Sequence, residues 1–99
     1  MAKKFKDFLG EEISANGFSL QARDAHDTAK NINYIFIKHS SWFSSPKPMH
    51  IRELREEYKR LVPDMELHFP GVVDKIFHPD IITKLGYPVD SNGMVHWSR

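Results

Sequence analysis

Three consecutive patterns in the second half of the chain constrain its fold more than any other feature. Residues 48–61 carry apolar side chains at helical spacing, residues 71–85 have the densest apolar content, and residues 87–97 combine short apolar runs with an Asn92-Gly93 pair. Asn-Gly is a favoured central pair of a tight hairpin turn, because both positions need a left-handed backbone. The order predicted for this half is therefore helix, helix, hairpin.

The helix expected over residues 48–61 has one apolar stripe. Pro48 stands where a proline in the first turn is tolerated, since the N–H that it lacks has no partner there. The opposite face interleaves charges of both signs, which is typical of a solvated surface, and Arg52, Glu56 and Arg60 are spaced to pair along it. The stripe consists of Ile51, Leu54, Tyr58 and Leu61.

A proline divides the apolar segment that follows. Pro79 would remove one hydrogen bond from a continuous helix and clash with the preceding turn, so two short helices are expected, over residues 71–77 and 80–85. Asp80 is the expected N-cap of the second helix, and Gly86 is expected to end it.

The first half of the chain has weaker patterns. Apolar residues at helical spacing predict a short amphipathic helix over residues 3–14. Residues 32–37 are β-branched and aromatic, which suits a buried strand, yet they also match the spacing of a buried helix. We expect one helix over residues 24–39, because a strand needs a partner and only the weak alternation in residues 65–69 or the terminal hairpin offers one.

A serine-rich linker separates the two halves. Residues 40–47 are followed by Pro48 and contain Pro46, and each proline disfavours helix at the residue before it. Trp42 and Phe43 are unusual in a linker: either they fold back over the core or they form an exposed aromatic pair for partner contact or base stacking. With 99 residues, the whole chain has the length of a single domain.

Composition constrains the function mainly by exclusion. The chain has no cysteine, which excludes disulfides, thiolate zinc sites and cysteine catalysis. The sequence also lacks a convergent metal-ligand set, a nucleophile elbow and a phosphate-binding glycine loop, so we expect neither an enzyme nor a bound cofactor or metal. Charged residues interrupt the apolar runs, so we expect no signal peptide or membrane span and a cytoplasmic location.

The expected fold is a small, mainly helical α+β domain that ends in a β-hairpin, an order that resembles the winged helix-turn-helix. In that motif the second helix enters the major groove of DNA and the hairpin contacts the flanking backbone. The first functional hypothesis is therefore a nucleic-acid-binding protein that regulates transcription and is not catalytic. Its candidate contact residues are Lys75, His78, Thr83, Lys84, Asn92, His96 and Arg99.

The charge balance counts against this hypothesis. The chain has 14 Lys and Arg residues against 13 Asp and Glu residues, a net charge of only +1, whereas dedicated nucleic-acid domains usually carry a basic excess or a basic stripe. The six histidines can add positive charge in mildly acidic solution, so electrostatic binding is expected to strengthen as the pH falls.

The alternative is a module for protein–protein interaction, for example an accessory factor of a mobile element. It would use exposed aromatic side chains, for which Trp42, Phe43 and Trp97 are the candidates. Salt separates the two hypotheses, because binding to nucleic acid weakens steeply as salt displaces the protein from phosphate, while an aromatic protein contact changes little. The sequence names no target sequence, partner or oligomeric state.

Overall fold

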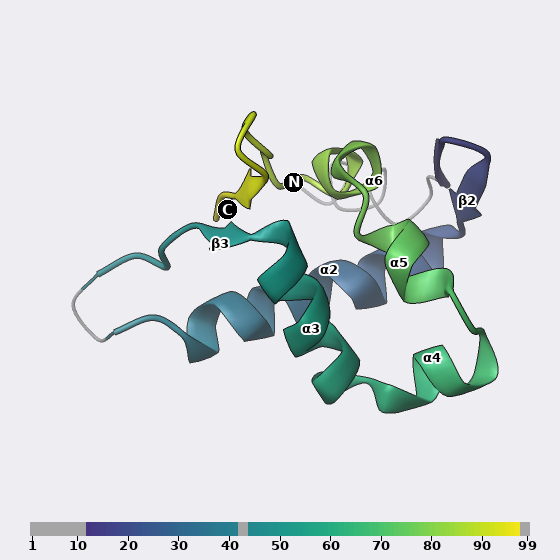
Figure 1. The fold of residues 1–99 in the computed structure, drawn as a ribbon, viewed down its shortest axis with the longest axis horizontal. Coiled ribbons are helices and arrows are strands. Elements are labelled where there is room, and N and C mark those ends of the chain that lie inside the picture. Colours follow the sequence, from purple (N-terminus) through teal and green to yellow (C-terminus); the bar gives the residue numbers. More distant parts are fainter. Residues whose placement is uncertain (1–11, 42–43, 98–99) are drawn as a thin grey trace, which may run out of the picture.

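Helices dominate the described part of the chain, which also contains two small sheets of two strands each (Figure 1). The computed structural model describes residues 12–41 and 44–97. The architecture is α+β, as the sequence predicts. No helix within these two ranges is both long and apolar enough to cross a membrane. The elements are β1 (Ile13–Ala15), β2 (Phe18–Leu20), α2 (Ala22–Lys38), β3 (Met49–His50), α3 (Ile51–Leu61), α4 (Pro63–His68), α5 (Val72–Ile76), α6 (Pro79–Lys84) and β4 (Met94–Val95).

The helix expected over residues 24–39 is confirmed as α2, which runs from Ala22 to Lys38 and crosses behind α3 in Figure 1. Its buried side chains follow helical spacing and form one face against the core. The strand interpretation of residues 32–37 is therefore wrong. The buried residues of α2 are Ala25, Thr28, Ile32, Ile35 and Phe36.

The helix expected over residues 3–14 is wrong at its end, because Ile13 and Ser14 belong to β1, which pairs antiparallel with β2. Residues 3–11 of that prediction lie outside the described ranges. The signal taken as a helix stop, Asn16-Gly17, instead forms the hairpin turn, and both residues have positive φ, 55° and 75°. Asn-Gly satisfies the left-handed geometry of such a turn directly.

Helix α3 begins at Ile51 and not at Pro48, because Met49 and His50 form β3 and pair with Val95 and Met94 of β4. The ring of His50 then caps α3, since its Nδ1 accepts a hydrogen bond from the N–H of Arg52 at 3.1 Å. The predicted stripe is buried at its centre, where Leu54 and Tyr58 are fully covered, while Leu61 at the end remains 37% exposed.

Residues 65–69, whose alternation offered a strand, lie in α4 and just after it. The two short helices predicted around Pro79 are confirmed as α5 and α6. The predicted cap is wrong: the Nδ1 atom of His78 accepts the N–H of Asp80 at 3.1 Å, so His78 caps α6 and Pro79 occupies its first turn.

The C-terminal hairpin is confirmed. Val89 bridges Val95, and the N–H of Asp90 donates to the carbonyl of Met94 at 3.0 Å. The second strand of the hairpin, β4, also pairs with β3, so the hairpin lies beside the residues that lead into α3 (Figure 1). Gly93 is required at this contact, because its φ is +82° and a Cβ atom there would lie 2.9 Å from Nε2 of His50.

Aromatic side chains attach the base of the hairpin to α2. The ring of Phe36 stacks on Tyr87 at 6.1 Å between centroids and meets Trp97 edge-on at 5.8 Å. The hydroxyl of Tyr87 donates to the carbonyl of Ala29 at 3.0 Å and forms a second hydrogen bond with the side-chain amide of Asn33. Burial raises the pKa of Tyr87 well above its ordinary value of 10.0, so the hydroxyl keeps its proton.

Candidate nucleic-acid interface

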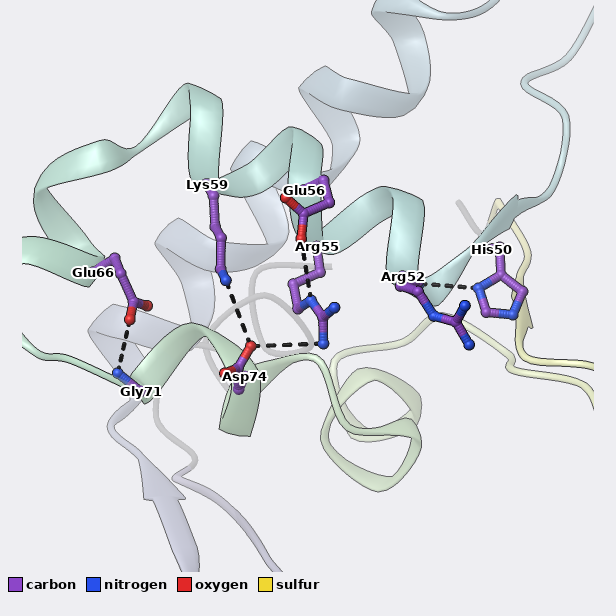
Figure 2. A network of polar contacts seen from close by, with 8 residues as sticks. All are labelled: His50, Arg52, Arg55, Glu56, Lys59, Glu66, Gly71 and Asp74. Carbon is purple, nitrogen blue, oxygen red and sulfur yellow. Dashed lines mark hydrogen bonds and ion pairs between the residues drawn. The ribbon is translucent and has the colours of Figure 1, made fainter.

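Three of the four cations of α3 lie along one side of the helix. Arg52, Arg55 and Lys59 are three and four residues apart, which places them on that side, and Arg55 and Lys59 point toward α5 (Figure 2). On the other side, Glu57 lies 3.6 Å from the ring of His39 at the end of α2. The helix therefore turns a cationic side toward α5 and an anionic side chain toward α2.

A single carboxylate connects the cationic side of α3 to α5. Oδ1 of Asp74 lies 3.6 Å from Nη1 of Arg55 and 3.7 Å from Nζ of Lys59 (Figure 2). The start of α5 is fixed by Gly71, whose φ of 84° suits glycine and whose N–H donates to Oε2 of Glu66 at 3.0 Å. Asp74 thus projects from the first turn of a helix whose position is set locally, and its negative charge is engaged by two cations of α3.

We call four cations of α3 and α5 the basic strip. Asp74 pairs with two of them, Glu56 lies 3.7 Å from Nε of Arg55, and Arg52 lines a shallow hollow together with Glu53 and Glu56. Four cations against the three carboxylates of Glu53, Glu56 and Asp74 leave the strip with a net charge of +1. The basic strip consists of Arg52, Arg55, Lys59 and Lys75.

Two of the predicted contact residues, Lys75 and His78, line a hollow of about 250 Å³ between α5 and the β1–β2 turn. The amide nitrogen of Asn16 lies 3.1 Å from Nδ1 of His78 and donates to Oδ2 of Asp80 at 3.0 Å. Because Nδ1 of His78 accepts the N–H of Asp80, the hydrogen of the neutral ring resides on Nε2. His78 can therefore donate from Nε2 to an oxygen of a ligand.

Thr83 and Lys84, two further predicted contacts, lie exposed at the end of α6. Within the described part of the chain, neither side chain makes a hydrogen bond or an ion pair. Both are thus available to a phosphate, although neither reads a base in the bidentate way of arginine, asparagine or glutamine.

The hairpin supplies Asn92, which is exposed at the tip, and His96, whose ring is already engaged. Nε2 of His96 lies 3.0 Å from Oδ2 of Asp90, and Oδ1 of the same carboxylate accepts the N–H groups of Asn92 and Met94. The hydrogen bond from His96, followed by that from the N–H of Met94, holds the pKa of Asp90 below its ordinary value of 3.8. His96 therefore contributes mainly to the structure of the hairpin.

The alternative interface is not assembled in the expected form. Trp97 is half-buried and packs against Phe36, so it is part of the edge of the core and not an exposed anchor. Trp42, Phe43 and the predicted contact Arg99 lie outside the described residues. Within the described residues, no group of three or more His, Asp or Glu side chains could hold a metal ion.

Sequence reasoning did not select Arg55 and Lys59, the two cations that contact Asp74. Their spacing on α3 is visible in the sequence, but the alternation of signs indicated a solvated face, and the partner Asp74 is distant along the chain. Comparison with known proteins adds no family, because no family model, curated protein or solved structure matches the chain. The function is therefore argued from the residues themselves.

Proposed function

We propose that this protein is a non-catalytic, nucleic-acid-binding regulator with a winged-helix arrangement in its C-terminal half, and that it binds duplex DNA mainly through phosphate. The order helix α2, strand β3, helix α3, short helices α5 and α6, and hairpin supports the arrangement. So does the pairing of β3 with β4, because it places the hairpin beside the start of α3, as a wing requires.

The observation that carries the proposal is the contact of Asp74 with Arg55 and Lys59. Judged from the sequence alone, the acidic residues within 71–85, Asp74 and Asp80, would repel a phosphate backbone. In the fold, the carboxylate of Asp74 is balanced by two cations of α3, and the strip around it keeps a positive charge. Lysine and arginine side chains placed in this way contact phosphates and orient the protein on the duplex.

The same residues indicate a binder of low sequence specificity. Helix α6 offers Thr83 and Lys84 but no arginine, asparagine or glutamine, the side chains that form bidentate contacts with bases in the major groove. Affinity would then come mostly from the release of counterions from DNA, and it would fall steeply as salt is added.

The test is an amide NMR titration of the full ¹⁵N-labelled chain with a mixed-sequence DNA duplex, at low and at physiological salt. We expect shifts at the basic strip, at residues 71–85 and at the hairpin, and we expect salt to reduce them. The double variant Lys75→Glu/Lys84→Glu should abolish these shifts, and the fold should persist because both lysines are exposed.

The matched control is Lys30→Glu/Lys38→Glu, which makes the same change in net charge on the exposed side of α2. It should weaken binding much less. An unchanged wild-type spectrum at low salt would refute DNA binding, and equal losses in both double variants would show that only net charge matters and that the basic strip is not the interface.

A further inference from the structure

Three large apolar side chains remain in contact with water where α2 passes the end of α3. Tyr34 is 54% exposed and Ile37 57% exposed, and their spacing of three residues puts them on the same side of α2. Leu61, in the last turn of α3, is 37% exposed. Single exposed apolar residues are ordinary, but Tyr34 and Leu61 line one hollow between the two helices and Ile37 lies beside Tyr34 on α2, which gives a patch of the kind that binding surfaces use.

The junction is hollowed. A groove of about 140 Å³ lies between α2 and α3, and the buried side chain of Ile35 contributes to its lining. This volume accommodates the tip of one leucine or phenylalanine side chain, and not a drug-sized ligand, which needs several hundred Å³. The remaining lining residues are Tyr34, Lys38, Glu57, Arg60 and Leu61.

The groove has a cation at its edge. Lys38 lines the groove, and Lys30 lies two turns earlier on α2. The one acid in the lining, Glu57, is engaged by Nη1 of Arg60 at 2.9 Å and by the ring of His39 at 3.6 Å. The two lysines form no ion pair within the described ranges, so their charge is available to a partner.

We propose that this groove docks an acidic, amphipathic helix of another protein. Apolar side chains one turn apart on that helix would contact Tyr34, Ile37 and Leu61, and its glutamates or aspartates would face Lys30 and Lys38. A groove between two helices, with apolar anchors and a charged rim, suits this mode of recognition. The docked helix lies on the side of α3 away from the basic strip, so it leaves the proposed DNA contact open.

The charges around the groove favour an acidic helix of another protein over a second copy of the same chain. A symmetric dimer through this face would bring the patch against its own image, and Lys30 and Lys38 would then lie near the same lysines of the other protomer. Such like charges at an interface disfavour association, whereas an acidic partner is attracted to them.

The experiment measures the fluorescence anisotropy of a labelled helical peptide as the full chain is added, at physiological salt. The probe carries leucines at positions i, i+3, i+4 and i+7 and glutamates on its other face. A second peptide has the same leucines with lysines in place of the glutamates. We expect the acidic peptide to bind and the basic peptide not to bind.

Two variants of the protein test the two components of the groove. Leu61→Ser removes a partly exposed apolar side chain from the lining of the groove, and it should weaken binding about tenfold, as loss of a central anchor typically does. Lys38→Glu should weaken binding of the acidic peptide and allow the basic peptide to bind. The matched control is Leu67→Ser on α4, since Leu67 is 75% exposed and lies outside the lining of the groove; this variant should bind as the wild type does.

The proposal is overturned if the acidic peptide fails to bind the wild type, or if Leu61→Ser and Lys38→Glu bind it as tightly as Leu67→Ser. Sedimentation velocity gives the remaining outcome. A wild-type dimer that Leu61→Ser dissociates would identify a second copy as the occupant and would refute the acidic partner.

Discussion

Replacing Asp74 with asparagine tests the proposed interface, because the substitution should increase the affinity for DNA. Damage to the fold would lower that affinity, so it cannot produce the same result. The substitution keeps the size of the side chain and removes the charge that lies 3.6 Å from Arg55 and 3.7 Å from Lys59. In the wild type this carboxylate competes with DNA phosphates for the two cations. In Asp74→Asn, Lys59 loses its carboxylate partner and Arg55 keeps only Glu56, so both cations bind phosphate more readily.

The magnitude follows from the charge of the basic strip. Removal of one carboxylate raises the net charge of the strip by one, which should steepen the slope of log affinity against log salt by about 0.9 and tighten binding about eightfold near 0.1 M salt. The cost in stability is small. The side chain of Asp74 is 57% exposed, so solvent screens its ion pairs, and such surface pairs contribute about 0–1 kcal/mol.

The assay is the fluorescence anisotropy of a labelled DNA duplex over a series of salt concentrations, with thermal unfolding as a check on the fold. The matched control is Asp27→Asn, which changes the net charge of the protein equally but lies on α2, away from the basic strip. Asp27→Asn should gain little affinity. If Asp74→Asn binds DNA no more tightly than the wild type, or if Asp27→Asn gains as much, the basic strip is not where phosphate binds.

Three further predictions concern stability. Tyr87→Phe removes the hydroxyl that bonds α2 and should lower the free energy of unfolding in urea by about 1 kcal/mol, while Tyr34→Phe, at an exposed position, should leave the urea midpoint unchanged. Gly93→Ala forces a Cβ to within 2.9 Å of the His50 ring at a φ of +82° and should cost more than about 1 kcal/mol; a melting temperature equal to that of the wild type would contradict the described contact of the hairpin with His50. The lowered pKa of Asp90 means that its carboxylate stabilises the hairpin above the ordinary pKa of 3.8 and that this contribution disappears as the pH falls through the lower value of the folded state. Amide exchange of the hairpin should therefore accelerate in acid, and Asp90→Asn, which lacks this titration, should show no such acid-dependent step.

Local signals in the sequence predicted several elements correctly. Pro79 divides the apolar segment into α5 and α6, because a proline cannot donate the hydrogen bond of a helix interior, and this effect needs no tertiary partner. Asn92-Gly93 likewise specifies a turn through its own backbone preferences. The same kind of signal at Asn16-Gly17 was interpreted as a helix stop, because a local turn preference does not indicate what lies on either side of it.

Other features depended on contacts between residues that are distant along the chain. Residues 32–37 fitted a helix and a strand equally well, and the packing of one face of α2 into the core decided between them. Met49 and His50 leave the expected helix because β4, more than forty residues later, offers backbone partners. The sequence by itself determined where the chain can turn and which stretches are amphipathic, since these depend on neighbouring residues. Only the tertiary structure brought Asp74 to Arg55 and Lys59 and left Tyr34, Ile37 and Leu61 exposed, because charge balance and burial depend on residues that are distant along the chain.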